Sequence, residues 1–196
     1  MTAMETILVV NAGSSSVKFE IFALEPGGGL RRHLKGQADG IGTRPRLRAT
    51  GPDGTPIVDR SYAATEVTDV PAALNLASAW LREEHAIAPI AVGHRVLHGG
   101  PDYDRPTLID DAVLAGLERY VCLAPLHQPH NLAPIRSIRA LFPNLPQVAC
   151  FDTAFHRGQH KTRRRKGGTY PLSHLYGHFK LVRLCRLGHD VPWVKA

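Results

Sequence analysis

The first sixty residues alternate between short apolar runs and clusters of turn-forming residues. Residues 5–11 (ETILVVN) form a β-branched run that predicts a buried strand, followed by a small, hydroxyl-rich turn. Residues 17–23 (VKFEIFA) alternate apolar and polar side chains and predict the returning strand of a hairpin, with Phe22 breaking the alternation. Further strands are expected at residues 30–39, 45–50 and 55–62, with a turn at residues 51–54. The pattern indicates a meander of strands.

Beyond residue 62 the apolar period changes from two residues to about 3.6, the period of a helix. The apolar positions of a first helix are Val70, Leu74, Ala77 and Leu81. Asp69 is expected to cap its N-terminus, and Pro71 suits its first turn. A second helix is expected over residues 113–121, beginning near Asp110 and Asp111, whose charges favour a helix N-terminus.

A third helix is predicted over residues 132–141, with Asn131 as its cap and Pro143 beyond its end. Strands are expected at residues 90–96 and 147–151, on either side of the second and third helices. Strands followed by a β-α-β alternation are typical of an α/β domain with a mixed sheet.

The composition is that of a globular protein. The chain has 196 residues, of which 43% are hydrophobic and 21% charged, which excludes a disordered or coiled-coil protein. No apolar run reaches the roughly 20 residues of a membrane span, and the first residues carry Glu5 without the cationic start of a secretory signal. Cys122, Cys150 and Cys185 form no CxxC pair, which favours a reducing compartment and argues against a zinc site. We therefore predict a cytoplasmic protein that does not enter the membrane.

The charge divides the chain into two parts. Residues 1–159 hold 15 of the 24 lysines and arginines and 16 of the 17 aspartates and glutamates, a net charge of −1. Residues 160–196 hold the other 9 basic residues and only Asp190, a net charge of +8, and they show no sustained apolar period. The predicted organisation is a domain at residues 1–159 and a poorly ordered basic tail at residues 160–196.

Two segments near predicted strand ends carry groups that bind anions. Residues 11–18 (NAGSSSVK) offer backbone N–H groups, serine hydroxyls and a lysine to a phosphate, but an ordinary hairpin turn explains the same residues, and the spacing is not that of a P-loop. Residues 93–100 (GHRVLHGG) place Arg95 just past a strand end, as a bidentate receptor for a carboxylate or phosphate or as a structural ion-pair partner. His94 and His98 lack a third ligand, so a metal site of histidines is not predicted.

Two later segments are equally ambiguous by themselves. His127 lies in a loop between two prolines, where it either donates a hydrogen bond to an anion or fixes the loop as a buried polar residue. Asp152 follows an apolar strand, at the strand end where ligands bind in open α/β sheets. In that position Asp152 could hold a metal ion, orient an arginine or exchange a proton. The purely structural alternative is that it caps a following helix. The basic run at residues 163–166 is either a polyanion-binding site or a solvated tail, and it lacks the interleaved aromatic residues of single-strand binders.

Four motifs, in this order, resemble the N-terminal half of the acetate kinase family: ILVVNAGSSSVKF, VGHRVLHGG, LAPLHQPHNL and ACFDTAFH. The resemblance covers about residues 4–158. It implies the actin-like, ribonuclease H-like fold of sugar kinases and Hsp70, of which this chain has the first of the usual two lobes. It also implies an ATP-dependent phosphotransferase that converts acetate and ATP to acetyl phosphate and ADP, with Mg²⁺, and a homodimer.

The resemblance assigns expected roles to individual side chains. Asn11 is similar to the family's magnesium-associated residue, and Arg95 to the arginine that binds the acetate carboxylate. The expected nucleotide contacts are Lys18, Ser14 and Ser16. His127 resembles a residue near the acyl-phosphate site, and Asp152 the residue given the proton donor/acceptor role. Because acetate is ionised at neutral pH, we expect Asp152 to act through magnesium or by orienting Arg95 rather than as a base.

The sequence departs from the family after Gln159. The family continues with a YGFHG motif and a second lobe, whereas residues 176–179 (YGHF) have similar letters in another order. We therefore predict a shifted reading frame from about residue 160 and an incomplete, inactive acetate kinase. The alternatives are a non-enzymatic module that binds polyanions through its tail, although nucleic acid is not the expected partner, and a related short-chain acyl kinase such as butyrate kinase.

Overall fold

The computed structural model describes residues 4–153 of the chain. The predictions made for the basic tail, its order and its reading frame lie outside these residues.

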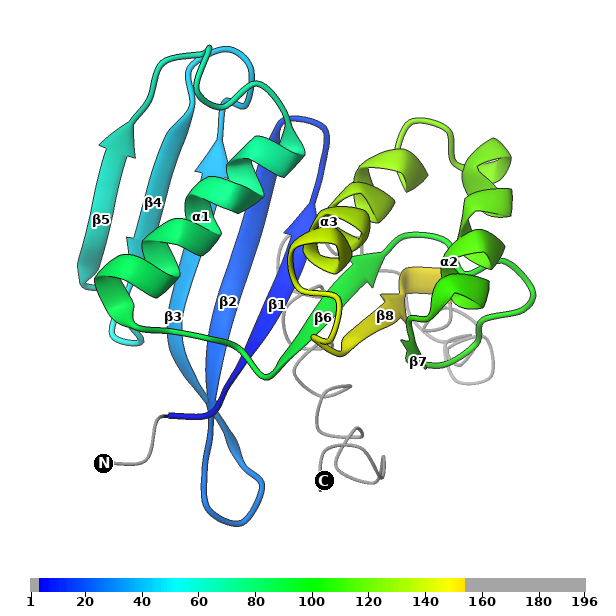
Figure 1. Cartoon of the computed structure of the whole chain (residues 1–196), viewed down its shortest axis with the longest axis horizontal. Coiled ribbons are helices and arrows are strands. Elements are labelled where there is room, and N and C mark those ends of the chain that lie inside the picture. The colour runs from blue at the N-terminus through cyan, green and yellow to red at the C-terminus, as the bar shows by residue number, and fades with distance from the viewer. Residues whose placement is uncertain (1–3, 154–196) are drawn as a thin grey trace, which may run out of the picture.

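Within residues 4–153, eight strands form one mixed sheet in the order β5-β4-β3-β2-β1-β6-β8-β7 (Figure 1). The strands are β1 (Thr6–Ala12), β2 (Ser16–Leu24), β3 (Leu30–Asp39), β4 (Arg46–Thr50), β5 (Pro56–Ser61), β6 (Ala91–Val96), β7 (Thr107–Leu108) and β8 (Gln147–Phe151). Strands β1, β6 and β8 are parallel neighbours, and the remaining pairs are antiparallel. The predicted mixed sheet and its meander are confirmed; β7 is too short for a sequence pattern to reveal.

Aspartate caps set the start of the first two helices; the predicted cap at Asp69 and the predicted start of the second helix near Asp110 are confirmed. Helix α1 (Val70–His85) begins after Asp69, whose carboxylate accepts the backbone N–H of Ala72 at 2.8 Å. Helix α2 (Asp111–Glu118) begins after Asp110, whose carboxylate accepts the N–H of Val113 at 2.7 Å. A 3₁₀ helix, η1 (Arg119–Leu123), continues from α2. The helix expected over residues 113–121 therefore changes type, which apolar spacing cannot reveal over a single turn.

Helix α3 (Gln128–Leu141) begins four residues earlier than predicted. The prediction that Asn131 caps this helix is wrong: His127 occupies the N-cap position without a side-chain hydrogen bond, and Asn131 is buried inside the helix. Pro129 accounts for the earlier start, because a proline in the first turn lacks only an N–H that has no helical partner there. The end of α3 at Leu141, two residues before Pro143, agrees with the prediction.

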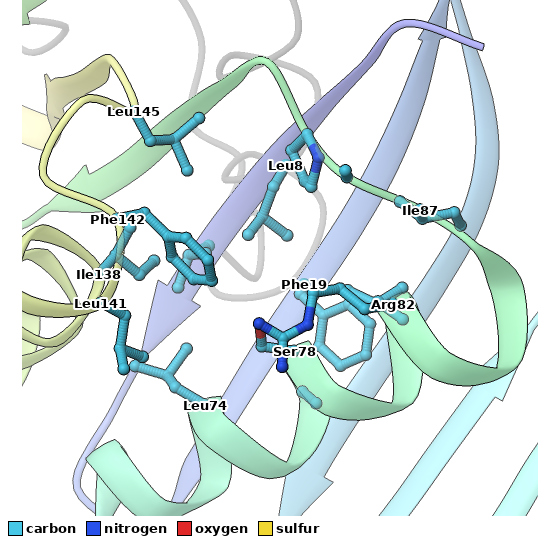
Figure 2. A pocket seen from close by; sticks show the side chains of 15 residues that line it. Leu8, Phe19, Leu74, Ser78, Arg82, Ile87, Ile138, Leu141, Phe142 and Leu145 are labelled. Atoms are coloured by element: carbon cyan, nitrogen blue, oxygen red, sulfur yellow. The ribbon is translucent and has the colours of Figure 1, made fainter. Parts of the chain in front are cut away.

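Helices α1 and α3 pack side by side on one face of the sheet (Figure 1). Phe19 of β2 meets Trp80 of α1 with ring centroids 6.3 Å apart. An apolar pocket of about 150 Å³ remains between the two helices (Figure 2), and its wall includes Leu8, Leu74 and Phe142. No helix within residues 4–153 has the length and apolarity to span a membrane.

The opposite face of the sheet carries a smaller apolar cluster, formed by the buried side chains of Val9, Phe22 and Cys150. Phe22 breaks the alternation of β2 because this face also buries apolar side chains, so a polar residue is not required there. This smaller cluster lies on the same face of the sheet as the candidate site residues Asn11 and Asp152. Residues two apart on a strand point to the same face, and Asn11 follows Val9 by two residues, as Asp152 follows Cys150.

Replacing Gly36 by alanine should destabilise the domain by about 1–3 kcal/mol, because overpacking forces neighbouring groups to move. Gly36 lies on β3 opposite Phe19, and a Cβ atom there would be 2.3 Å from the Phe19 ring. Urea unfolding measures the effect. Gly13→Ala is the matched control, since its Cβ would meet no atom nearer than 3.9 Å. Equal unfolding midpoints for the two variants would contradict the packing argument.

Candidate active site

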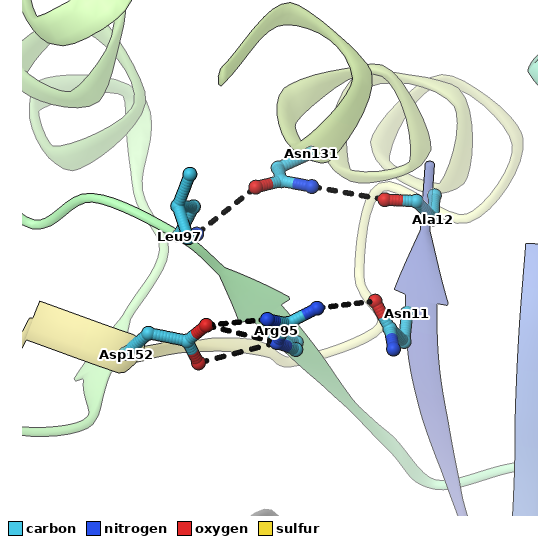
Figure 3. Close-up of polar contacts among 6 residues, drawn as sticks. All are labelled: Asn11, Ala12, Arg95, Leu97, Asn131 and Asp152. Carbon is cyan, nitrogen blue, oxygen red and sulfur yellow. Dashed lines mark hydrogen bonds and ion pairs between the residues drawn. The ribbon is translucent and has the colours of Figure 1, made fainter. Parts of the chain in front are cut away.

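Three of the predicted site residues come from three neighbouring parallel strands. Asn11 lies near the end of β1, Arg95 is the last residue but one of β6, and Asp152 directly follows β8. The sequence analysis placed Arg95 just past a strand end, whereas the structure places it within β6. Because the carboxyl ends of parallel strands share one edge of a sheet, the three side chains meet there (Figure 3).

Arg95 connects the other two side chains. Its Nη2 donates to Asp152 Oδ2 at 2.5 Å, and its Nε lies 3.1 and 3.2 Å from the two carboxylate oxygens. Its Nη1 donates to Asn11 Oδ1 at 3.2 Å. The Arg95 and Asp152 side chains are 34% and 29% exposed, so the pair is half-buried and open to a ligand. The ion pair left open for Arg95 therefore exists, and its partner is another candidate site residue.

The hydrogen bonds of Arg95 leave part of its guanidinium available. A guanidinium has five N–H donors. One on Nε, one on Nη2 and one on Nη1 are used by Asp152 and Asn11, so one donor on each Nη atom has no acceptor among residues 4–153. Two donors on one planar cation match the two oxygens of a carboxylate or of a phosphate.

Lys18 extends this polar group along the sheet. It pairs directly with Asn11 across the antiparallel β1–β2 ladder, so the two side chains lie on the same face. Gly13 donates its N–H to the carbonyl of Ser16 at 2.9 Å and closes the turn between the strands. The hydroxyls of Ser14 and Ser16 have no hydrogen-bond partner among the described residues. The turn is an ordinary hairpin and also brings its serines to the edge where Arg95 lies.

The histidines lie outside this hydrogen-bond network. His127 is exposed at the start of α3, and no bond among Asn11, Arg95 and Asp152 involves it. His94 points to the other face of β6, where its Nε2 lies 2.7 Å from Gln147 Oε1, and burial lowers its pKa to about 4 despite that hydrogen bond, which raises it. His98 Nδ1 accepts the N–H of Gly100 at 2.9 Å. Within residues 4–153 no three His, Cys, Asp or Glu side chains are grouped to hold a metal ion.

Sequence reasoning missed the residues that fix the loop after Arg95. Thr153 Oγ1 accepts the N–H of Gly99 at 3.1 Å. Just before it, Asn131 accepts the N–H of Leu97, and Gln128 donates to the carbonyl of His98. Gly99 has no room for a side chain, because a Cβ would lie 2.6 Å from the Tyr103 carbonyl oxygen and 2.8 Å from the Phe151 ring. The glycine pair was the available signal that this loop is tightly packed.

Known proteins of one family match this chain over most of its length. Residues 6–184 match the model of the Acetokinase family. The chain belongs to the acetokinase family. It is 68% identical over 154 residues to the acetate kinase of Nitrobacter hamburgensis, an alignment that covers 79% of this chain and 38% of that relative. The chain thus spans well under half the length of this relative, and the family match continues beyond Gln159 into the basic segment.

Solved structures of family members have the same fold. The chain superimposes with a TM-score of 0.68 on acetate kinase from Porphyromonas gingivalis, at 32% identity over 85% of this chain and 42% of that one. The TM-score is also 0.68 for a propionate kinase from Francisella tularensis, at 34% identity over 87% of this chain and 43% of that one. The actin-like fold predicted from the motifs is confirmed, with this chain matching about two fifths of each kinase.

Proposed function

We propose that this chain supplies the acyl-binding lobe of an acetate kinase, which transfers a phosphoryl group between ATP and acetate. The observation that carries the proposal is the half-buried Arg95, which is fixed by Asp152 and Asn11 and keeps two N–H donors for an anion. In the forward direction an acetate oxygen attacks the γ-phosphorus of ATP, the bond to the bridging oxygen breaks, and ADP leaves. Arg95 would bind the acetate carboxylate and orient that oxygen.

Asp152 would serve as an orienting group in this reaction. Acetate is already ionised at neutral pH, so no proton has to be removed before it attacks. Contact with both Nε and Nη2 restrains rotation of the Arg95 guanidinium, as an orienting role requires. We propose Lys18, Ser14 and Ser16 as phosphate contacts, since they lie on or beside the β1–β2 turn next to Asn11. His127 is proposed to approach the acyl phosphate from the start of α3.

The donor atoms at this edge fit Mg²⁺, which we propose as the metal that accompanies ATP. Mg²⁺ prefers oxygen ligands and commonly takes only one or two from the protein, with phosphates and water completing its shell. The amide oxygen of Asn11 and the carboxylate of Asp152 are oxygen donors of this kind, both beside Arg95. When bound, the metal would neutralise charge on the transferring phosphoryl group. We also propose a cytoplasmic location and a homodimer.

Propionate is the second candidate acyl substrate. The likeness to the Francisella propionate kinase equals the likeness to the Porphyromonas acetate kinase in TM-score. One additional methylene in an apolar pocket changes specificity by only about 10- to 200-fold. Comparison of kcat/KM for acetate, propionate and butyrate, measured on a chimera that continues after residue 158 with the C-terminal part of the Nitrobacter acetate kinase, decides between these acyl kinases. The highest value for acetate is the expected result.

A polypeptide limited to these 196 residues should form negligible acetyl phosphate. The family resemblance implies a second lobe that supplies cationic groups and adenine contacts on the other side of the phosphoryl group, and the reaction needs both lobes. A chimera that continues after residue 158 with the C-terminal part of the Nitrobacter acetate kinase should turn over at roughly 1–1,000 per second. The assay contains acetate, ATP and Mg²⁺. Turnover by the short polypeptide at such rates, or none by a folded chimera, would contradict the proposal.

We further propose that translation leaves the family's reading frame near residue 160. Charge and apolar period both change there, whereas the family match extends to residue 184, so the encoding DNA is the direct test. One of the other two frames beyond Gln159 should encode a YGFHG-like segment and a second α/β lobe. If neither does, the tail is genuine. A steep fall of polyanion affinity with salt would then favour the binding-module alternative.

A further inference from the structure

The main-chain pairing between β1 and β6 ends just before the candidate active site. The parallel register runs from Ile7 beside Ala91 to Val10 beside His94. The next residues on the two strands are Asn11 and Arg95, whose side chains bond to each other at 3.2 Å. The β1–β6 ladder of backbone hydrogen bonds therefore ends one residue before these two candidate site residues, so other contacts must fix the distance between them.

Asn131 bridges the two strand ends beyond that point. Its Nδ2 donates to the carbonyl of Ala12 at 2.9 Å, and its Oδ1 accepts the N–H of Leu97 at 2.9 Å. Figure 3 shows the carboxamide between the two strand ends on one side, while Arg95 and Asn11 meet on the other. A carboxamide has the same donor and acceptor as a peptide group, so Asn131 takes the place of a ladder hydrogen bond.

The same helix also fixes the next backbone position. Gln128, one turn before Asn131 on α3, donates its Nε2 to the carbonyl of His98 at 3.0 Å. The Leu97 N–H and the His98 carbonyl are thus both bound by side chains of α3. Asn131 is buried, with 7% of its surface exposed, so removal of its amide leaves a carbonyl and an N–H without water as an easy replacement.

We propose that Asn131 is a positioning residue, which sets the distance between Asn11 and Arg95 and so prepares Arg95 for an anionic substrate. It touches neither side chain and acts through the backbone at Ala12 and Leu97. The inference rests on the proposed function for its substrate, acetate. The predicted effect of Asn131 on Arg95 can be measured without any substrate, by hydrogen exchange at Arg95 Nε–H.

Hydrogen exchange measured by NMR on the 196-residue chain tests this role. In the wild type, the side-chain NH₂ of Asn131 and the backbone N–H of Leu97 should both be protected. Asn131→Ala should speed exchange at Leu97 N–H and at Arg95 Nε–H roughly fivefold to tenfold, the size expected for the loss of one hydrogen bond. Asn131→Asp keeps the acceptor for Leu97 but removes the donor to Ala12, so it should affect Arg95 while sparing Leu97.

Ile138→Val on the same helix is the control for a general loss of stability, since Ile138 packs in the α1–α3 core and contacts no strand end through hydrogen bonds. It should leave Arg95 Nε–H exchange unchanged. If Asn131→Ala does not fold, Asn131→Asp and the protection of the wild-type amide carry the test. Unchanged Arg95 exchange in the folded variants, or an unprotected Asn131 amide in the wild type, would overturn the proposal.

Acetate titration of the same samples separates the two proposals. Acetate should shift the Arg95 guanidinium signals in the wild type and bind several-fold more weakly to the Asn131 variants. If the wild type shows no acetate-dependent shift, the proposed function loses support while the effect on Arg95 exchange still stands. If acetate binds equally well to wild type and variants, the positioning role is refuted and the proposed function is not.

Discussion

Replacing Arg95 by leucine should raise the KM for acetate roughly 100-fold in the two-lobed chimera, the loss expected when a charged group with two hydrogen bonds to its ligand is removed. The structure gives the reason for a large effect. Two N–H donors of Arg95 have no acceptor within residues 4–153, and its removal also leaves the Asp152 carboxylate without its cation. The kcat/KM for ATP should fall much less, because acetate rather than ATP is the proposed ligand of Arg95.

Arg95→Lys should recover only part of the acetate affinity. A lysine ammonium supplies charge but cannot contact Asp152, Asn11 and a carboxylate in one planar arrangement. Arg44→Leu is the matched control, since Arg44 is exposed in the loop between β3 and β4. An acetate KM unchanged in Arg95→Leu would exclude the carboxylate-binding role and leave Arg95 as a structural partner of Asp152.

The domain should lose about 3 kcal/mol of stability between pH 6.5 and pH 4 through His94 alone. Burial lowers the pKa of His94 to about 4 in the folded domain, whereas an unfolded histidine has a pKa near 6.5. The unfolded state therefore binds a proton first as the pH falls, so the stabilisation is complete above pH 6.5 and lost progressively towards pH 4. His94 is 1% exposed, and among residues 4–153 its Nδ1 has no hydrogen-bond partner to stabilise the charged ring.

Urea unfolding at a series of pH values measures this dependence. His94→Gln should flatten the decline between pH 6.5 and pH 4, because no titrating group remains at that position. His127→Gln is the control, since His127 is exposed and should leave the decline as it is in the wild type. An equally steep decline in wild type and His94→Gln would show that other groups cause the acid sensitivity.

Local patterns predicted the elements well because the forces that form them are local. The caps at Asp69 and Asp110 each bond to an N–H three residues away, so their effect is visible in a short stretch of sequence. The same reasoning failed at Asn131, although asparagine is a residue type favoured at helix N-caps. Its amide instead bonds to Ala12, 119 residues away, and no local preference reports such a contact.

The sequence by itself determined the mixed sheet, the three main helices and, through the motifs, the family and the candidate site residues. Periodicity and capping follow from backbone geometry and from burial of one face, which each segment carries in its own residues. Only the tertiary structure decided which of those residues meet. Parallel pairing of β1, β6 and β8 brings Asn11, Arg95 and Asp152 to one edge, and the orientation of β6 puts His94 on the face opposite Arg95. These contacts join residues 57 and 84 positions apart in the chain, so they depend on how the strands are paired rather than on any segment alone.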